Sequence, residues 1–169
     1  MLQMKNVVLR RLQAADQEAL ARLVNNKKIW DNLRDYIPFP YSSRDAACFI
    51  DLANQEPVPM TFGIDAGGCL SGVVGLVGQS DVYRKTAEIG YWIGEPFWNQ
   101  GIASAAIGLA THHGIQHLGF NRVHAGVFEY NVASMRVLLK NGYVREGIFR
   151  KAVVKNEQVW DEHRFSFVK

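Results

Sequence analysis

One segment, residues 86–128, runs from a strand through a long helix into a second strand, with a short turn at each junction. Thr86–Ile93 alternates like a strand, Ile102–Leu118 is apolar and rich in alanine, and Arg122–Phe128 again has a strand pattern. Gly119 follows the helix as a stop signal. This order predicts a strand–helix–strand crossover at the centre of a mixed α/β sheet.

The other periodic segments surround this crossover. Asn32–Tyr41 contains two prolines and is expected to be a loop or a broken helix, and Ser42 is placed to cap the helix that follows it. The full order, β α α β β β α β α β β, predicts about seven strands. The remaining strands are expected around Val7 and Leu9 and over Met60–Ile64, Leu70–Gly78, Val144–Val154 and Gln158–Val168, with helices over Asp16–Asn26 and Ala133–Lys140.

Composition limits the class of protein. A chain of 169 residues, 48% hydrophobic and 21% charged, fits one globular domain over residues 1–169. The net charge of +3 is too small and scattered to indicate direct nucleic-acid binding. Cys48 and Cys69 are not in a CxxC pair, so we expect reduced, mostly buried thiols in a cytoplasmic protein. There is no signal-peptide pattern and no apolar run long enough to span a membrane.

The turn before the long helix is a candidate anion site. A helix N-terminus presents backbone N–H groups that have no partner within the helix, and the helix dipole favours negative charge there. Gly101 lets a ligand approach the backbone, and Ala103 keeps the first turn small. The sequence has neither GxxxxGK[ST] nor GxGxxG at this turn, so a tight turn without a ligand is the alternative.

Four stretches together resemble the GNAT superfamily of N-acetyltransferases, most closely its ribosomal-protein alanine or serine N-terminal acetyltransferases. They are "IPFPYSSRDAACFI", "AEIGYWIGEPFWNQGIA", "NRVHAGVFEYNVASMRVLLKNGYVREG" and "GIFRKAVVKNEQVWDEHRFSF". The resemblance covers nearly the whole chain. It implies a mixed, mostly antiparallel sheet with helices on both faces, whose fourth and fifth strands splay around acetyl-CoA.

The resemblance also assigns the cofactor-binding residues. The pyrophosphate loop of the family falls on Trp98, Asn99, Gln100, Gly101, Ile102 and Ala103, although the family has Gln or Arg at the position of Trp98. The pantetheine arm is expected along the backbone of Tyr91, Trp92 and Ile93. Asn131 and Ser134 are expected near the thioester. No metal is implied.

Acetyl transfer to an amine needs a base for the amine and a hydrogen-bond or proton donor for the departing thiolate. Glu88 is the leading base, acting through water; the alternative is an exposed or paired strand glutamate. Glu129, Asp161 and Glu162 are weaker candidates, expected to be surface or structural charges. Ser134 is the candidate donor, because the tyrosine that many family members carry is replaced by Leu138; a plain helix serine is the alternative.

Other side chains receive a structural interpretation. His112, His113 and His117 lie on the long helix without an acid at metal-site spacing, so we expect a solvated face. About half of Tyr91, Trp92, Phe97 and Trp98 are expected in the core and the rest along the acceptor channel. The resemblance places Arg34, Tyr36 and Tyr41 in loops that shape the acceptor site.

Three functions follow. The first is an acetyl-CoA-dependent N-acetyltransferase whose acceptor is a protein N-terminus or a small amine. The second is a non-catalytic acyl-CoA-binding module, and the third is a domain without a ligand. The family often dimerises through its C-terminal strands, so a homodimer is allowed.

Overall fold

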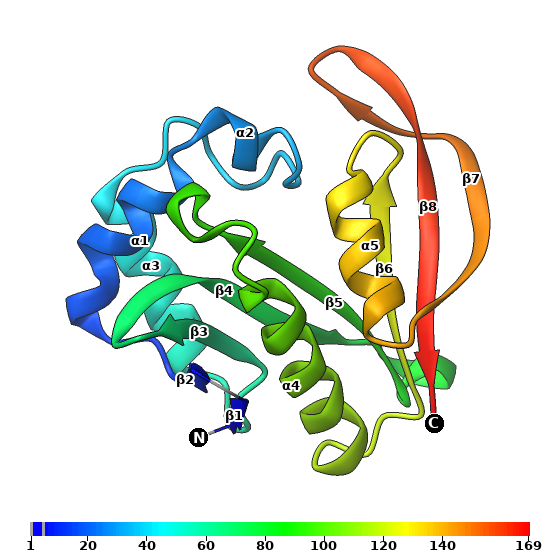
Figure 1. The fold of residues 1–169 in the computed structure, drawn as a ribbon, viewed down its shortest axis with the longest axis horizontal. Helices are drawn as coiled ribbons and strands as arrows, with labels where there is room; N and C mark the ends of the chain where they lie inside the picture. Colours follow the sequence, from blue (N-terminus) through cyan, green and yellow to red (C-terminus); the bar gives the residue numbers. More distant parts are fainter. Residues whose placement is uncertain (1, 5) are drawn as a thin grey trace.

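The computed structural model describes residues 2–4 and 6–169, and eight strands in this part of the chain form one sheet (Figure 1). Its order is β1-β2-β3-β4-β5-β6-β8-β7. Every neighbouring pair is antiparallel except β5 and β6, which are parallel. The strands are β1 (Leu2–Met4), β2 (Val7–Arg10), β3 (Thr61–Ala66), β4 (Cys69–Gly78), β5 (Thr86–Ile93), β6 (Arg122–Phe128), β7 (Val144–Lys155) and β8 (Gln158–Val168).

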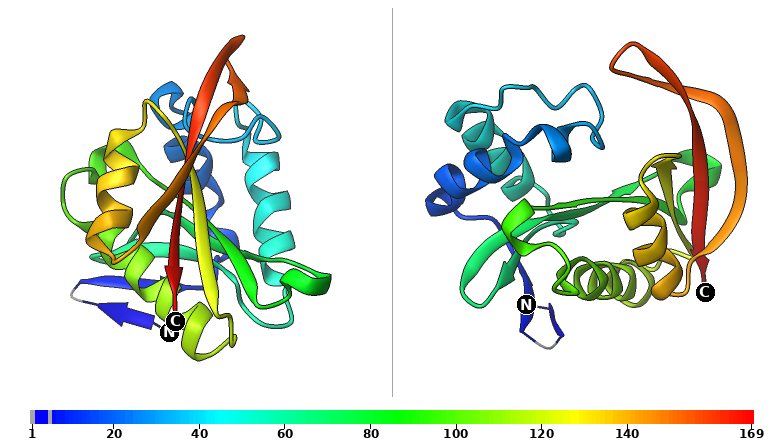
Figure 2. Two further views of the ribbon diagram at one scale, coloured as in Figure 1. Left: turned by 90° about the vertical axis from the view of Figure 1, so that its right-hand side faces the viewer. Right: turned by 45° about the horizontal axis from the view of Figure 1, so that its top comes forward.

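Helices cover both faces of the sheet (Figure 2). They are α1 (Gln17–Val24), α2 (Lys27–Trp30), α3 (Ser43–Asn54), α4 (Ile102–Gln116) and α5 (Val132–Lys140). Helices α1 and α3 pack on one face, and α4 packs on the other with α5 beside it. The predicted crossover is confirmed: α4 joins the two parallel strands β5 and β6.

Two apolar clusters follow from this layering. Val73 and Val74 are consecutive on β4 and therefore point to opposite faces. Val73 belongs to the cluster under α1 and α3, and Val74 to the larger cluster under α4. Strand β5 alternates in the same way, with Ile89 under α4 and Trp92 packed against the α1–α3 cluster. The two faces thus differ: one carries the crossover helix, and the other carries helices from the connection between β2 and β3.

The sheet opens between β5 and β6, as the resemblance implies. Only three residue pairs join the two strands, and the last is Glu88 with His124. Strand β5 remains paired with β4 up to Ile93, while β6 continues beside β8 up to Phe128. Both strands therefore keep their outer neighbours while they separate from each other.

The N-terminal strand differs from the prediction. The single strand expected around Val7 and Leu9 is β2, and β1 folds back against it, so the described sheet has eight strands instead of about seven. The stop signal at Gly119 is confirmed by its positive φ of 71°. Ser42 caps α3 by accepting a hydrogen bond from Asp45 N–H, as predicted.

The expected burial of the two cysteines is wrong. Both are free and exposed. Cys48 lies on the solvent side of α3, whereas Ala46 and Ile50 of the same helix are buried. Cys69 is the first residue of β4, directly after the Gly67–Gly68 turn, and is exposed there.

Candidate active site

The turn before α4 presents backbone donors to solvent. Gly101 is the N-cap of α4 with a φ of 77°, and no side chain caps the helix. The first intrahelical bond there is from Ala105 N–H to the Gly101 carbonyl, so the N–H groups of residues 102–104 have no partner within the helix. No heavy atom lies within 4 Å of a Cβ built on Gly101. The positive φ, and not a close neighbour within the chain, therefore favours glycine. The geometry suits an anion such as a pyrophosphate.

Trp98 joins this turn to the end of β5. Its indole Nε1 donates a hydrogen bond to the Ile93 carbonyl at 2.7 Å, while the rest of the ring is partly exposed. Between Ile93 and Trp98, the three residues Glu95–Phe97 form a 3-10 turn whose N-cap is Gly94. The side chain that departs from the family pattern thus holds the loop against the strand.

One edge of β5 is open where the strands separate. Gly94 N–H donates to the Ser71 carbonyl at 2.8 Å, which fixes the side of β5 that bonds to β4. Because backbone groups alternate along an antiparallel pair, the N–H and C=O groups of Tyr91 and Ile93 point toward the opening, whereas those of Trp92 point toward β4. Among the three predicted residues, the backbone of Tyr91 and the N–H of Ile93 are therefore placed to receive a ligand.

The side chains of Tyr91 and Ser134 meet across the opening. Their hydroxyl oxygens are 2.6 Å apart, and either hydroxyl can donate. Burial raises the pKa of Tyr91 to about 12, so its hydroxyl keeps its proton at neutral pH. Asn131 is the N-cap of α5, because its side-chain oxygen accepts a hydrogen bond from Ser134 N–H at 3.1 Å. The strand β5 and the helix α5 are thus joined by two hydroxyl groups where Ser134 was expected alone.

Glu88 lies at the apex of the opening, on the face opposite α4. Its carboxylate forms an ion pair with Arg34, which comes from the loop after α2. His124 is its partner in the last β5–β6 pair. Burial lowers the pKa of His124, against the opposing effect of Glu88, so the imidazole is neutral at pH 7. The predicted base is therefore paired, and a neutral histidine lies on the adjacent strand.

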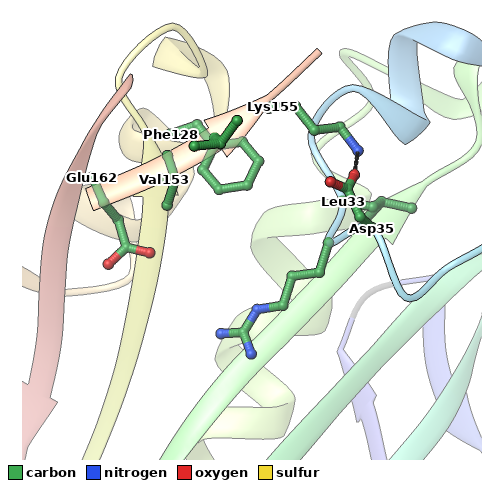
Figure 3. Close-up of a pocket in the computed structure, with 8 residues that line it drawn as sticks. Leu33, Asp35, Phe128, Val153, Lys155 and Glu162 are labelled. Atoms are coloured by element: carbon green, nitrogen blue, oxygen red, sulfur yellow. Dashed lines mark hydrogen bonds and ion pairs between the residues drawn. The ribbon is translucent and has the colours of Figure 1, made fainter. Parts of the chain in front are cut away.

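A pocket of about 280 Å³ lies on this face, between the loop after α2 and the strands β6, β7 and β8 (Figure 3). Lys155 closes one side: its ammonium is 2.6 Å from an Asp35 oxygen and 3.3 Å from the centre of the Trp30 ring. The contacts join the C-terminal hairpin to the early loop. The pocket is lined by Leu33, Arg34, Asp35, Phe128, Val153, Val154, Lys155 and Glu162.

Glu162 lines this pocket, so of the two positions expected for it, a surface charge or a structural charge, the surface one is wrong. It is only 8% exposed, and its carboxylate forms an ion pair with Arg164 at 2.5 Å. Asp161, the next candidate, accepts a hydrogen bond from Lys151 N–H instead. The sequence alone does not indicate which of the neighbours Asp161 and Glu162 points inward. Their side chains lie on opposite faces of β8, so the register of the strand determines which one is buried.

The remaining expectations are structural. His113 is half-buried and its Nε2 is 3.0 Å from the Pro59 carbonyl, so only His112 and His117 lie on an exposed face. In the described residues, no group of three or more potential ligands is placed to hold a metal ion. Arg34 reaches the pocket, Tyr36 is exposed, and Tyr41 packs against the α1–α3 cluster. Over the described part of the chain, no helix is both long and apolar enough to cross a membrane.

Comparison with known proteins identifies the family of this arrangement. Residues 6–144 match a family model described as an acetyltransferase (GNAT) domain. An uncharacterized N-acetyltransferase of Bacillus subtilis strain 168, YoaA, is 30% identical over 172 residues, which cover 99% of this chain and 96% of the relative. The ribosomal-protein-serine acetyltransferase of Escherichia coli K12 is 35% identical over 83 residues, 49% of this chain and 46% of that protein.

Solved structures agree. The microcin self-immunity acetyltransferase MccE, in complex with acetyl-CoA and AMP, has a TM-score of 0.82 and 26% identity over 98% of this chain and 94% of that chain. The spermidine N-acetyltransferase of Vibrio cholerae, in complex with CoA and spermine, has a TM-score of 0.81 and 20% identity, with coverage of 96% and 95%. These neighbours include more than one class of acceptor.

Proposed function

The chain belongs to the GNAT acetyltransferase family and is an N-acetyltransferase that uses acetyl-CoA, and from this premise we propose that its acceptor is the N-terminal amine of a protein or peptide. The observation that carries this proposal is the pairing of the acidic groups around the pocket. Glu88 is paired with Arg34, Asp35 with Lys155 and Glu162 with Arg164.

A polycation would meet an unfavourable site. Each additional ammonium of a polyamine needs a carboxylate beyond the one that receives the reacting amine, and Glu88, Asp35 and Glu162 each already have one cationic partner. A peptide brings one amine and an uncharged backbone. Leu33, Phe128 and Val153 supply apolar wall for its first side chain. Partial identity with a ribosomal-protein-serine acetyltransferase supports the same choice.

The catalytic roles that we propose follow from the placement of each group. The backbone N–H groups at the α4 N-terminus and the open edge of β5 hold acetyl-CoA in this proposal, through residues 98–103 and the backbone of Tyr91 and Ile93. Binding there brings the thioester to the apex of the opening, and most of the rate enhancement comes from this orientation. Glu88 takes the proton of the attacking amine, directly or through water, once the acceptor displaces Arg34.

Ser134 stabilises the departing thiolate in this proposal. Its hydroxyl is held between the α5 backbone and Tyr91, so one hydrogen can point into the opening while Tyr91 donates to Oγ. The C–N bond of the amide forms as the C–S bond breaks, and the amine loses one proton to Glu88. The thiolate takes up one proton from solvent, and Glu88 returns its proton to solvent, so no proton is gained or lost overall. No covalent bond to the enzyme is required.

Release of the CoA thiol tests the acceptor class. The release of free CoA thiol is measured with a panel of short peptide amides that differ in their first residue, and with spermidine. The rate of acetyl-CoA hydrolysis without an acceptor is subtracted. We expect kcat/KM to be higher for at least one peptide amide than for spermidine. A preference for spermidine over every peptide would refute the proposed acceptor.

Glu88→Gln tests the base. We expect turnover to fall by about 10²-fold or more, the usual effect of removing a general base, with the Kd of desulfo-CoA unchanged within a few-fold. Glu146→Gln is the matched control, because Glu146 on β7 forms an ion pair with Arg122 on β6 and does not line the pocket. Full turnover of Glu88→Gln at all pH values removes that role. The cytoplasmic location and the homodimer remain predictions.

A further inference from the structure

Glu162 is a buried carboxylate with few polar contacts. Among the residues that the structure describes, its one polar contact is the ion pair between Oε1 and Arg164 Nε, so no described group donates to Oε2. Buried carboxylates normally accept several hydrogen bonds, so one that lacks them in a pocket has capacity for a ligand. Arg34 also lines the pocket, but its guanidinium is paired with Glu88 and not with Glu162.

Gly126 provides the space for this carboxylate. A Cβ built on Gly126 would lie 2.5 Å from Glu162 Oε2 and 2.7 Å from its Cδ. Glu162 is paired with Phe128 in the β6–β8 ladder, so its side chain leans back along β6 to lie over Gly126. Any larger residue at position 126 would push the carboxylate away.

This position is next to the opening of the sheet. The last β5–β6 pair involves His124, and Gly126 is two residues further along β6. At the usual rise of a strand, the Glu162 carboxylate thus lies about 7 Å beyond the apex, where the two strands have already separated. The pocket and the proposed path of the pantetheine arm meet at this point.

We propose that Glu162 binds the amino group of the acceptor, with Oε2 accepting a hydrogen bond from it, and that Gly126 keeps this oxygen in place. This inference rests on the proposed function and adds to it by assigning amine binding and proton removal to two different carboxylates. Glu162 holds the amine in the pocket, and Glu88 at the apex takes its proton. The paired Arg164 fixes one oxygen, which leaves the other for the ligand.

Two variants test the role. Glu162→Gln keeps the shape and removes the charge, and Gly126→Ala keeps Glu162 but displaces its flexible end. We expect both to raise the acceptor KM about 10- to 100-fold, the effect of losing one charge-assisted hydrogen bond, with the Kd of desulfo-CoA within twofold of wild type. The probe is the peptide amide with the highest kcat/KM in the panel, and Glu146→Gln is the control.

A binding measurement adds a readout that is independent of turnover. The same peptide amide and its N-acetylated form are titrated into the protein saturated with desulfo-CoA. We expect the wild type to bind the free amine more tightly than the acetylated form, and Glu162→Gln to lose this difference. An acceptor KM for Glu162→Gln within twofold of wild type, or a retained difference, overturns the role of Glu162.

Failure of the proposed function gives a different result. If the wild type acetylates spermidine and no peptide, the proposed acceptor is wrong, and the same comparison with spermidine still decides the role of Glu162. If the wild type acetylates no amine, both proposals fall.

Discussion

Gly72 on β4 should be indispensable for the alignment of β5. A Cβ at this position would lie 2.2 Å from the Trp92 carbonyl oxygen and 3.0 Å from Ile93 Cα. Both are backbone atoms in the strand that carries the open edge. No rotamer change can relieve the contact, so a Gly72→Ala variant must push β4 and β5 apart.

The size of the effect follows from the geometry. An ordinary contact of 3.4 Å requires a local shift of about 1.2 Å. The bond from Gly94 N–H to the Ser71 carbonyl is 2.8 Å long and lies one residue away, so the same shift takes it out of hydrogen-bonding range. One or two lost ladder bonds at about 1 kcal/mol each, with about 1–2 kcal/mol of overpacking, give a destabilisation of ~2–4 kcal/mol.

Urea unfolding of Gly72→Ala and Gly75→Ala measures this. Gly75 is on the same strand, but the nearest atom to its added Cβ is Thr61 Oγ1 at 3.5 Å, an ordinary contact. We expect Gly75→Ala to stay within about 1 kcal/mol of wild type, since it lacks the overlap. Equal unfolding free energies for the two variants would refute the reasoning. Weaker desulfo-CoA binding by the folded fraction of Gly72→Ala should accompany the loss.

Three further predictions concern charge and hydrogen bonding. Burial acts to raise the pKa of Asp16, but the bidentate contact with Arg10 outweighs it, and the pKa is lowered. The stability that Asp16 adds is therefore complete above about pH 4 and is lost as the pH falls further. The urea midpoint of the Asp16→Asn variant should therefore change less with pH between about pH 2 and 5 than that of the wild type. Arg34→Gln frees a carboxylate near the pocket, so the ratio of kcat/KM for spermidine to that for a peptide amide should rise; an unchanged ratio contradicts the charge argument. Tyr91→Phe removes one hydroxyl partner of Ser134 and should lower kcat about 3- to 10-fold without changing desulfo-CoA affinity, and a Ser134→Ala background should abolish this effect.

The sequence indicates the parts of the site that depend on local structure. The strand, the turn and the helix over residues 86–118 are consecutive, so their patterns predict the anion site without tertiary information. The Asn131 cap is local for the same reason. The family resemblance then supplied the opening between β5 and β6, which periodicity alone does not indicate.

The parts that the sequence misses depend on register and long-range packing. Ser134 meets Tyr91 from 43 residues away, and Glu162 turns inward only because β8 pairs with β6 in one particular register. The Lys155–Asp35 contact joins residues 120 positions apart. Cys48 was misjudged because an amphipathic helix can carry a small apolar residue on its solvent side.

Acetyl-CoA bound in the opening between β5 and β6, as we propose, would link the stability of the protein to the supply of its donor. Acetyl-CoA binds the folded chain and not the unfolded one, so at a free concentration 100 times Kd it adds about 2.7 kcal/mol to the free energy of unfolding. That is a large fraction of the stability of a typical domain. When acetyl-CoA is depleted, the share of unfolded molecules rises about 100-fold, and proteases that act on unfolded chains would remove the enzyme when its donor is scarce.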